Sequence, residues 1–218
     1  MGKQIQYRHA REGDLPYIVE IFGECSSDGI KHRFPCGLSD EVLETVWDFL
    51  LQADSSSCIV ASVVDGDSKI CGYCLVQSSV SQLVREGFSR GLIPRLAGLI
   101  WSGKLPVGLH QLKTVLFDLI AFGRTFDVAD PESTGQVLSI GVQPQFRGEG
   151  MGTELVRRGL EVLEEKGIYR VKLEVRPGNE PARRIYDKMG FEVVGSSEDS
   201  VGKWLIMIRE CDQEDAYT

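Results

Sequence analysis

The sequence contains no run of about 18 apolar residues, the length that a membrane-spanning helix requires. Its N-terminal residues also lack the apolar core of a signal peptide. Basic residues are few, with 24 Lys and Arg against 32 Asp and Glu and a net charge of −8. This balance disfavours a nucleic-acid partner. We therefore expect a cytoplasmic protein with no nucleic-acid partner and no membrane span.

Cysteine is present, but not in the arrangement of a metal site. Six cysteines are scattered along the chain, and Cys71 and Cys74 form a C-x-x-C pair. The pair lies in a strand-like run, where alternation would place the two thiols on opposite faces. No second pair follows at the spacing of a zinc site. We expect reduced, structural cysteines and no bound metal.

The first part of the chain predicts strands and helices in alternation. Alternating or continuous apolar runs predict three strands, at residues 4–10, 57–64 and 69–77. The last two are joined by Asp65-Gly66, a dipeptide typical of a hairpin turn. Two helices are expected between the first and second strands, capped by Asp14 and Ser39. The first would end near Phe22, because the stretch 25–37 is rich in serine and glycine and predicts a loop.

A long segment, residues 78–134, separates the hairpin from the next predicted strand. Apolar residues recur in it at helical spacing and predict three helices, near residues 80–88, 92–100 and 111–122. Residues 78–124 carry six Lys or Arg and two Asp or Glu, a net charge of +4 in an acidic chain. The segment is therefore a folded, basic part of the protein.

Three alternating glycines mark the stretch around which the chain is organised. They lie in the turn Arg147-Gly148-Glu149-Gly150-Met151-Gly152-Thr153, between an apolar strand at residues 137–142 and a helix that Gly167 would end. Glycine lets the backbone N–H groups of a turn approach a ligand closely. The helix N-terminus adds partial positive charge, and Arg147 adds a full one, with Arg157 and Arg158 close by in the sequence. These features predict an anion site suited to a diphosphate.

Two other phosphate-binding fingerprints fit less well. The dinucleotide fingerprint G-x-G-x-x-G, counted from Gly148, meets Thr153 where its third glycine should stand. Residues 98–104 spell G-x-x-x-x-G-K, but Leu105 stands where a Ser or Thr should follow. We therefore assign neither pattern to the site.

A second strand–turn–helix unit follows the glycine turn. Val171, Leu173 and Val175 alternate with polar residues, which predicts a half-buried strand. Asn179, the only asparagine in the chain, would cap a helix that runs to about Met189. Two final strands are expected on either side of a polar turn, at residues 191–194 and 203–209.

Together the two units resemble the GNAT family of acetyl-CoA-dependent N-acetyltransferases. Arg147, Gly150 and Gly152 match the family motif R/Q-x-x-G-x-G/A, and residues 173–191 spell L-E-V-R-x-x-N-x-x-A-x-x-x-Y-x-x-x-G-F. The resemblance covers residues 137–194. It implies an α/β fold with a mixed, mostly antiparallel sheet of about seven strands flanked by helices. Residues 1–218 would then form a single domain, with residues 78–134 as a helical insertion between the third and fourth strands.

The resemblance also implies a cofactor and a reaction, the transfer of an acetyl group from acetyl-CoA to a primary amine in a ternary complex. In that family the glycine turn, here residues 147–153, binds the pyrophosphate of coenzyme A. The preceding strand, here Ile140, Gly141 and Val142, pairs with the pantetheine arm, which an asparagine at the position of Asn179 also contacts.

Two further positions are given a catalytic role by the resemblance. A tyrosine at the position of Tyr186 lies near the sulfur and protonates the leaving thiolate. In the subgroup similar to ribosomal-protein N-terminal acetyltransferases, the glutamate at the position of Glu174 is the general base. Both residue types suit the reaction, because an ammonium must lose a proton before it attacks a thioester.

Several alternatives stay open at this point. The donor could carry a longer acyl chain, or the protein could be a coenzyme A-binding regulatory module that does not catalyse. Glu86 or His110, both in the insertion, could supply the base. The acceptor could be a protein N-terminus, a small amine or an amino sugar. Four roles are open for the insertion: a lid over the acceptor pocket, a homodimer contact, a membrane-surface element, or helices packed on the core.

Overall fold

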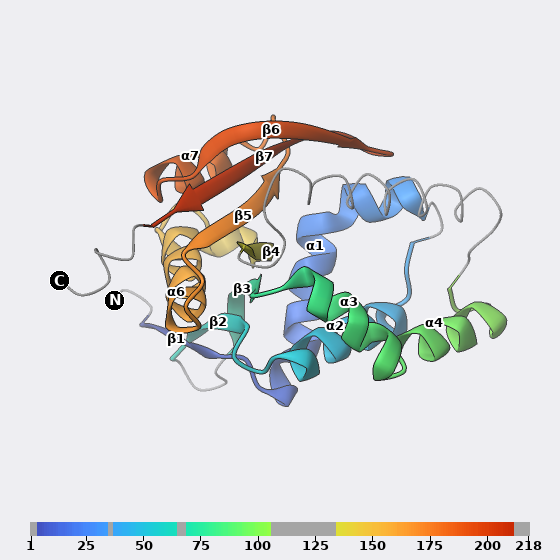
Figure 1. The fold of residues 1–218 in the computed structure, drawn as a ribbon. Coiled ribbons are helices and arrows are strands. Elements are labelled where there is room, and N and C mark those ends of the chain that lie inside the picture. The colour runs from blue at the N-terminus through green and yellow to red at the C-terminus, as the bar shows by residue number, and fades with distance from the viewer. Residues whose placement is uncertain (1–3, 35–36, 65–68, 106–133, 212–218) are drawn as a thin grey trace.

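The computed structural model describes residues 4–34, 37–64, 69–105 and 134–211, and a seven-stranded sheet forms its centre (Figure 1). The strands lie in the order β1-β2-β3-β4-β5-β7-β6. Their bounds are β1 Ile5–His9, β2 Cys58–Val63, β3 Ile70–Gln77, β4 Thr134–Val142, β5 Arg170–Val175, β6 Glu192–Asp199 and β7 Gly202–Glu210. β4 and β5 are parallel, and the other neighbouring pairs are antiparallel. The mixed, mostly antiparallel sheet expected from the sequence is confirmed.

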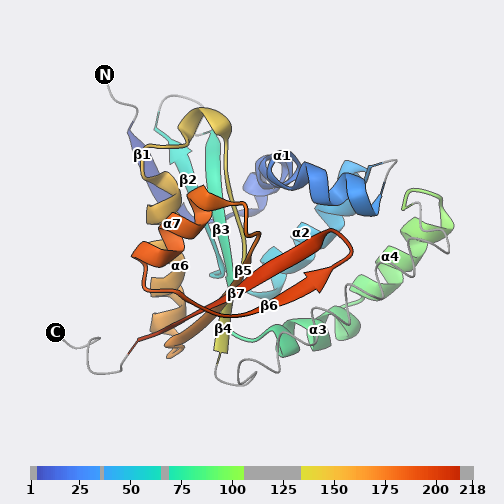
Figure 2. The same ribbon diagram turned by 90° about the horizontal axis from the view of Figure 1, so that it is seen from above.

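Helices cover both faces of this sheet (Figure 2). One face carries α6, Met151–Glu165, and α7, Glu180–Lys188. The other carries α1, Leu15–Arg33, and α2, Asp40–Ala53. Each face therefore has its own cluster of buried apolar side chains, which we call the α6 cluster and the α1 cluster. Fully burying a side chain of the size of leucine contributes about 1.5–3 kcal/mol, so both clusters hold the sheet between its helices.

The insertion begins as two helices that pack on α2. They are α3, Val80–Ser89, and α4, Leu92–Trp101, and both form where the spacing predicted a helix. Lys104 Nζ lies 2.7 Å from a Glu41 carboxylate oxygen of α2, so basic charge of the insertion meets acidic charge of α2. Two of the three expected helices thus pack on α2, and the role of the insertion stays open. The third expected helix and His110 lie outside the described residues.

An extra residue in β3 changes the expected orientation of the two cysteines. The register between β2 and β3 shifts at Ala61/Ser62, which makes Cys71 the extra residue of a β-bulge. The bulge brings Cys71 and Cys74 to the same side of the sheet, where both belong to the α6 cluster. The expectation of opposite faces is wrong, because strict alternation fails at a bulge.

The first helix is also longer than predicted. α1 continues through the serine- and glycine-rich stretch to Arg33, so the loop expected from residue 25 begins after it. Ile30 packs against the α1 cluster, and this burial outweighs the weak helix propensity of the residues around it. Asp14 and Ser39 occupy the predicted N-cap positions of α1 and α2, but neither side chain makes a capping hydrogen bond.

The last hairpin is tighter than predicted. β6 runs to Asp199, so the polar turn expected over residues 195–202 is confined to residues 200–201. Asp199 Oδ1 accepts hydrogen bonds from the N–H groups of Val201 and Gly202, at 2.9 and 3.0 Å. One carboxylate thus closes the turn between two long strands.

Two general features concern ligands and membranes. In the described ranges, no three or more His, Cys, Asp or Glu side chains are grouped so that they could hold a metal ion. The helices in the same ranges are all too short or too polar to cross a bilayer.

Candidate functional site

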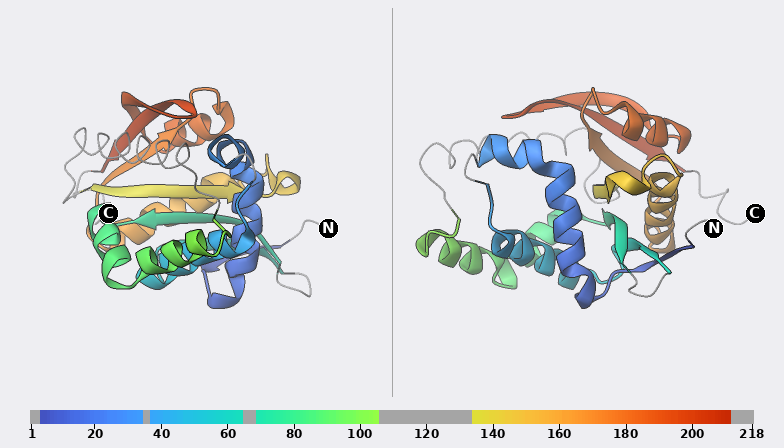
Figure 3. Two further views of the ribbon diagram at one scale, coloured as in Figure 1. Left: turned by 90° about the vertical axis from the view of Figure 1, so that its right-hand side faces the viewer. Right: turned by 180° about the vertical axis from the view of Figure 1, so that it is seen from behind.

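Strands β4 and β5 separate partway along their length (Figure 3, left). Their ladder begins with Thr134 and Arg170 and ends with Val137 and Leu173. Both strands continue, but Ser139–Val142 pairs with β3 alone, and Leu138 pairs with neither strand. One edge of this β4 segment is therefore left without a strand partner in the described sheet.

A β-bulge at Leu138 explains the separation. The register between β3 and β4 shifts so that Val137 and Ser139 face Val76 and Leu75, consecutive residues of β3. A bulge bends its strand and increases the local twist. This one follows directly after the last pair with β5, so it turns the rest of β4 away from that strand. The backbone groups on this edge can then pair with an extended ligand, as the edge of a sheet pairs with an added strand.

The segment predicted to hold pantetheine lies within this separated part of β4. Ile140 and Val142 pack toward the α6 cluster, whereas Gly141 faces α1. A Cβ added at Gly141 would lie 2.7 Å from the ring of Tyr73 and 2.8 Å from Ile21. Glycine is therefore needed here by packing.

The separated segment leads directly into the glycine turn. A 3-10 turn, Pro144–Phe146, and then Arg147 connect β4 to Gly148 and Gly150, which have φ of +84° and +82°. Residues with a side chain rarely adopt these left-handed values. A Cβ at either glycine would meet no atom within 4 Å, so the space at the turn is open.

The first turn of α6 presents backbone donors at this open space. Gly150 is its N-cap, so no capping side chain takes up the N–H groups of Met151, Gly152 and Thr153. Met151 is buried beneath the turn, while Glu149 is exposed. Free N–H groups at a helix N-terminus favour an anion. The open turn and the uncapped helix start are compatible with an anion at this place, and the diphosphate site stays a prediction.

Arg147 supplies the full positive charge at this turn. Its Nε donates to the carbonyl oxygen of Val142 at 2.9 Å, and its Nη2 lies 3.5 Å from the Cys25 sulfur of α1. Within the described part of the chain it forms no ion pair. Its guanidinium therefore links α1 to the end of β4 and keeps its charge available for an anion.

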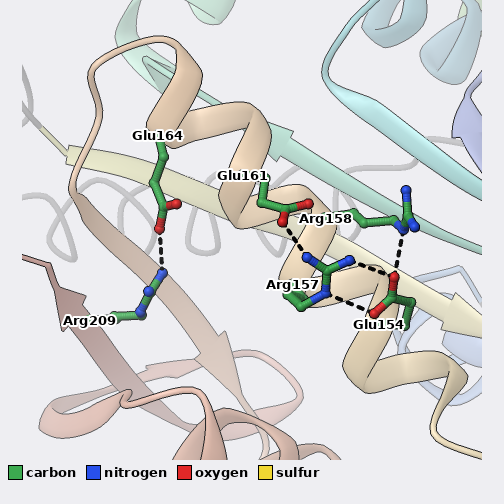
Figure 4. A network of polar contacts seen from close by, with 6 residues as sticks. All are labelled: Glu154, Arg157, Arg158, Glu161, Glu164 and Arg209. Atoms are coloured by element: carbon green, nitrogen blue, oxygen red, sulfur yellow. Dashed lines mark hydrogen bonds and ion pairs between the residues drawn. The ribbon is translucent and has the colours of Figure 1, made fainter. Parts of the chain in front are cut away.

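The two other nearby arginines are already paired on α6 itself (Figure 4). Arg157 Nη2 and Arg158 Nε each lie 2.7 Å from Glu154 Oε1, and Arg157 also bonds to Glu161. Hydrogen bonds from Arg157 and Arg158 lower the pKa of Glu154 to about 2. Arg157 and Arg158 thus add little unpaired charge to the turn, although the sequence places them close to it.

Asn179 and Tyr186 lie on α7, and the packing of this helix against α6 brings them to the same side of the sheet as the turn. Asn179 Oδ1 accepts a hydrogen bond from the Ala182 N–H at 3.3 Å, which confirms its role as a cap. Tyr186 is 5% exposed, and its ring meets Phe191 edge to face at 5.9 Å. Burial raises the pKa of Tyr186, which keeps the phenol protonated and able to donate a proton.

Glu174 lies on β5 beyond the point where β4 has turned away. Its Oε1 is 3.3 Å from Nζ of Lys172, two residues earlier on the same face of the strand. Lys172 is 2% exposed, so the expectation of a half-buried strand with its polar residues in solvent is wrong. β5 is a central strand with neighbours on both sides. Burial lowers the pKa of Lys172, and the Glu174 carboxylate acts against that effect.

The two candidate catalytic residues lie on opposite faces of the sheet. Tyr186 belongs to the α6 cluster together with Leu173 and Val175, and alternation places Glu174 on the other face of β5. A ligand held between β4 and β5 would have the glycine turn and the tyrosine on one side and the glutamate on the other. The alternative base Glu86 is on α3, where it bonds to Gln82 and Arg90.

Sequence reasoning missed two residues of this region. Leu138 forms the bulge, although many bulges are marked by a glycine. A leucine is common in strands, so the residue type gave no signal of a bulge. Lys172 stands in an alternating pattern that normally sends lysine into solvent. The only signal for Lys172 was its place two residues before Glu174, which strand geometry puts on the same face.

Comparison with known proteins identifies the same region. Residues 101–191 match the model of the "Acetyltransferase (GNAT) family". A Bacillus subtilis (strain 168) protein named for alanine N-acetylation of ribosomal protein bS18 is 33% identical over 78 residues, which are 32% of this chain and 52% of the relative. The mycothiol acetyltransferase of Corynebacterium glutamicum is 33% identical over 97 residues, 44% of this chain and 28% of the relative. The chain thus spans about half or less of the length of these relatives.

The similarity of the fold to solved structures covers nearly the whole chain. The crystal structure of the NatC complex bound to Gag peptide and CoA contains a chain that superimposes with a TM-score of 0.60 at 14% identity, covering 96% of this chain and 99% of that one. At this identity the likeness concerns the fold alone. The motif-bearing segment, the match of residues 101–191 to the GNAT acetyltransferase family model and the shared fold thus agree with one another.

Proposed function

We propose that this protein is an N-acetyltransferase that moves an acetyl group from acetyl-CoA to a primary amine by direct attack in a ternary complex. The observation that carries the proposal is the separation of β4 from β5 directly before the glycine turn. The unpaired edge of Leu138–Val142 suits the amide groups of a pantetheine arm. The open turn at Gly148 and Gly150 suits a diphosphate. One extended ligand would thus occupy both.

The residues around the free edge of β4 and the glycine turn have complementary roles in the proposed reaction. Glu174 accepts a proton from the acceptor ammonium, and the neutral amine then attacks the acetyl carbonyl. The C–N bond forms and the C–S bond breaks, with its electron pair leaving on sulfur. Tyr186 donates a proton to that sulfur and regains one from the nitrogen as the amide forms. Glu174 then releases its proton, so that one proton goes to solvent overall. No nucleophile of the protein is required, because the amine itself attacks.

The relatives suggest which amines to test as acceptors. One is named for an alanine of ribosomal protein bS18 and the other for mycothiol. We propose a peptide with an N-terminal alanine and a set of small amines as the first acceptors. Propionyl-CoA and a long-chain acyl-CoA would test whether the donor is restricted to acetyl.

The test measures coenzyme A release from acetyl-CoA with each amine, together with thermal unfolding with and without acetyl-CoA. Binding at 100 times Kd should add about 2.7 kcal/mol of stability. We expect release that depends on an amine, and no acetyl group retained on the protein after denaturation. Stabilisation without turnover by any amine would favour the non-catalytic module, and a trapped acetyl-enzyme would contradict direct attack.

A further inference from the structure

Lys172 is a buried cation beside the candidate base, and the proposed mechanism does not yet use it. It lies on β5 in register with Gln136 of β4 and Ile208 of β7, and 2% of its surface is exposed. A buried charge of this kind is costly unless it is paired. Its Nζ lies 3.3 Å from Glu174 Oε1, within the ion-pair range.

Glu174 is held by this contact at the place where the sheet opens. Its side chain is 16% exposed, against 2% for that of Lys172, so the pair has a buried end and an accessible end. Within the described part of the chain, the hydrogen bond to Lys172 is the one that the Glu174 side chain makes. Oε1 is thus committed to the lysine, and Oε2 is the oxygen left for a ligand.

From this arrangement we infer, given the proposed function, that Lys172 is the positioning residue for Glu174. It fixes the carboxylate at the opening between β4 and β5, so that Oε2 can take the proton of the acceptor ammonium.

Within the described residues, the other charged side chains of β5 are engaged elsewhere. Arg170 and Arg176, at the two ends of β5, are paired with Glu210 and Asp199. The facing residues on the neighbouring strands β4 and β7 are Gln136, Ile206 and Ile208, all uncharged. These groups are the same in every variant below, so their contribution cancels in the comparison.

The test variant removes the positive charge of Lys172 and keeps a side chain of similar volume. In Lys172→Met we expect kcat to fall toward the value of Glu174→Gln, by up to ~10²–10⁴-fold, while the Kd for acetyl-CoA stays unchanged. Lys172→Arg keeps a cation at this position and should restore most of the lost kcat.

A reciprocal variant keeps the test decisive if Lys172→Met fails to fold. In Glu174→Gln the pKa of Lys172, followed by 15N NMR, should fall, because coupling between two titrating groups is mutual. A folded Lys172→Met with the kcat of the parent protein would overturn the inference, as would a Glu174→Gln variant with an unmoved Lys172 titration. If the Lys172 titration moves but no amine is acetylated by the parent protein, the pair stands and the proposed function fails.

Discussion

At the scale of single residues, Tyr186 offers the most direct test of the reaction. Its ring is held by packing against Phe191, and its raised pKa keeps the hydroxyl protonated. Tyr186→Phe retains the ring and removes only the proton donor. We expect kcat to fall by ~10²–10⁴-fold, the usual value of general acid help, with little change in the Kd for acetyl-CoA.

The matched control for this variant is Tyr7→Phe. Tyr7 lies on β1 beneath the guanidinium of Arg158, 4.9 Å from the ring centre, and has no part in the proposed reaction. The variant Tyr7→Phe should leave kcat unchanged. Equal turnover by Tyr186→Phe and the parent enzyme would assign the acid role to another group.

A second residue-scale prediction concerns stability. Asp14 is 6% exposed and accepts hydrogen bonds from Arg8 at 2.6 and 2.9 Å and from the Arg11 N–H at 2.8 Å. Burial alone would raise the pKa of Asp14, but these bonds outweigh it and the pKa lies below its usual value. Asp14→Asn should cost about 1.5–3 kcal/mol at pH 7, measured by urea unfolding.

The pH dependence of that loss has a defined sign. Because the folded pKa is depressed, the contribution of Asp14 is complete above the pKa of an unfolded aspartate, ~3.9. It is lost as the pH falls through the lower folded value, so the parent and Asp14→Asn should converge in acid. Asp48→Asn, which removes a surface partner of Arg95, should change stability by less than about 1 kcal/mol. A constant difference at every pH would show that Asp14 acts through packing instead.

These residues also show what the sequence could tell about the site. Gly150, Asn179 and Tyr186 are recognisable because turn geometry, capping and motif spacing are local properties. Lys172 is not, since its burial depends on the strands that flank β5. Asp14 had the sequence context of a helix cap, but Arg8 on the neighbouring strand takes its carboxylate, a contact that local rules cannot foresee.

At the scale of elements, helix α6 has a left-handed glycine at each end. Gly150 precedes it with φ +82° and Gly167 follows it with φ +75°, both with open space around an added Cβ. The two lie about 22 Å apart or more, from the rise per residue of a helix of this length. Replacing either with alanine imposes the same backbone strain of roughly 1–2 kcal/mol.

A comparison of these two alanine variants distinguishes an effect on cofactor binding from an effect on folding. Gly150→Ala should weaken acetyl-CoA binding, because a methyl group enters the space proposed for the pyrophosphate. Gly167→Ala should lose similar stability and bind acetyl-CoA normally. Calorimetric titration of both folded variants decides this, and equal affinities would place the diphosphate elsewhere.

Element boundaries were predictable where propensity and burial agree. β2, β3, α3 and α4 form within a few residues of their predicted positions. The end of α1 was not predictable, because packing of Ile30 decides it. The bulge at Leu138 was not predictable either, since it is a matter of the register between β3 and β4 and not of the residue itself.

At the scale of the whole molecule, thiol labelling reports on the contact between α1 and the glycine turn. Cys58 and Cys74 are fully buried, and burial raises the pKa of Cys74 to about 12, so neither should react in the native protein. Cys25 is exposed and lies beside Arg147. It should alkylate first among these three, and acetyl-CoA should slow its labelling if Arg147 engages the phosphates. Mass spectrometry of each peptide measures this, and a Cys25 rate indifferent to acetyl-CoA would contradict that role for Arg147.

The ladder between β4 and β5 is short, so few backbone hydrogen bonds join the two parts of the sheet. In the part of the sheet that the structure describes, the pairing of residues 134–137 with 170–173 is the only strand-to-strand pairing between β1–β4 and β5–β7. A ligand bound along the free edge of β4 would add contacts between β1–β4 and β5–β7 and would make their relative position more rigid. Amide hydrogen exchange should then slow not only at residues 138–142 but across the β5–β7 side, so that the cofactor acts as a removable eighth strand.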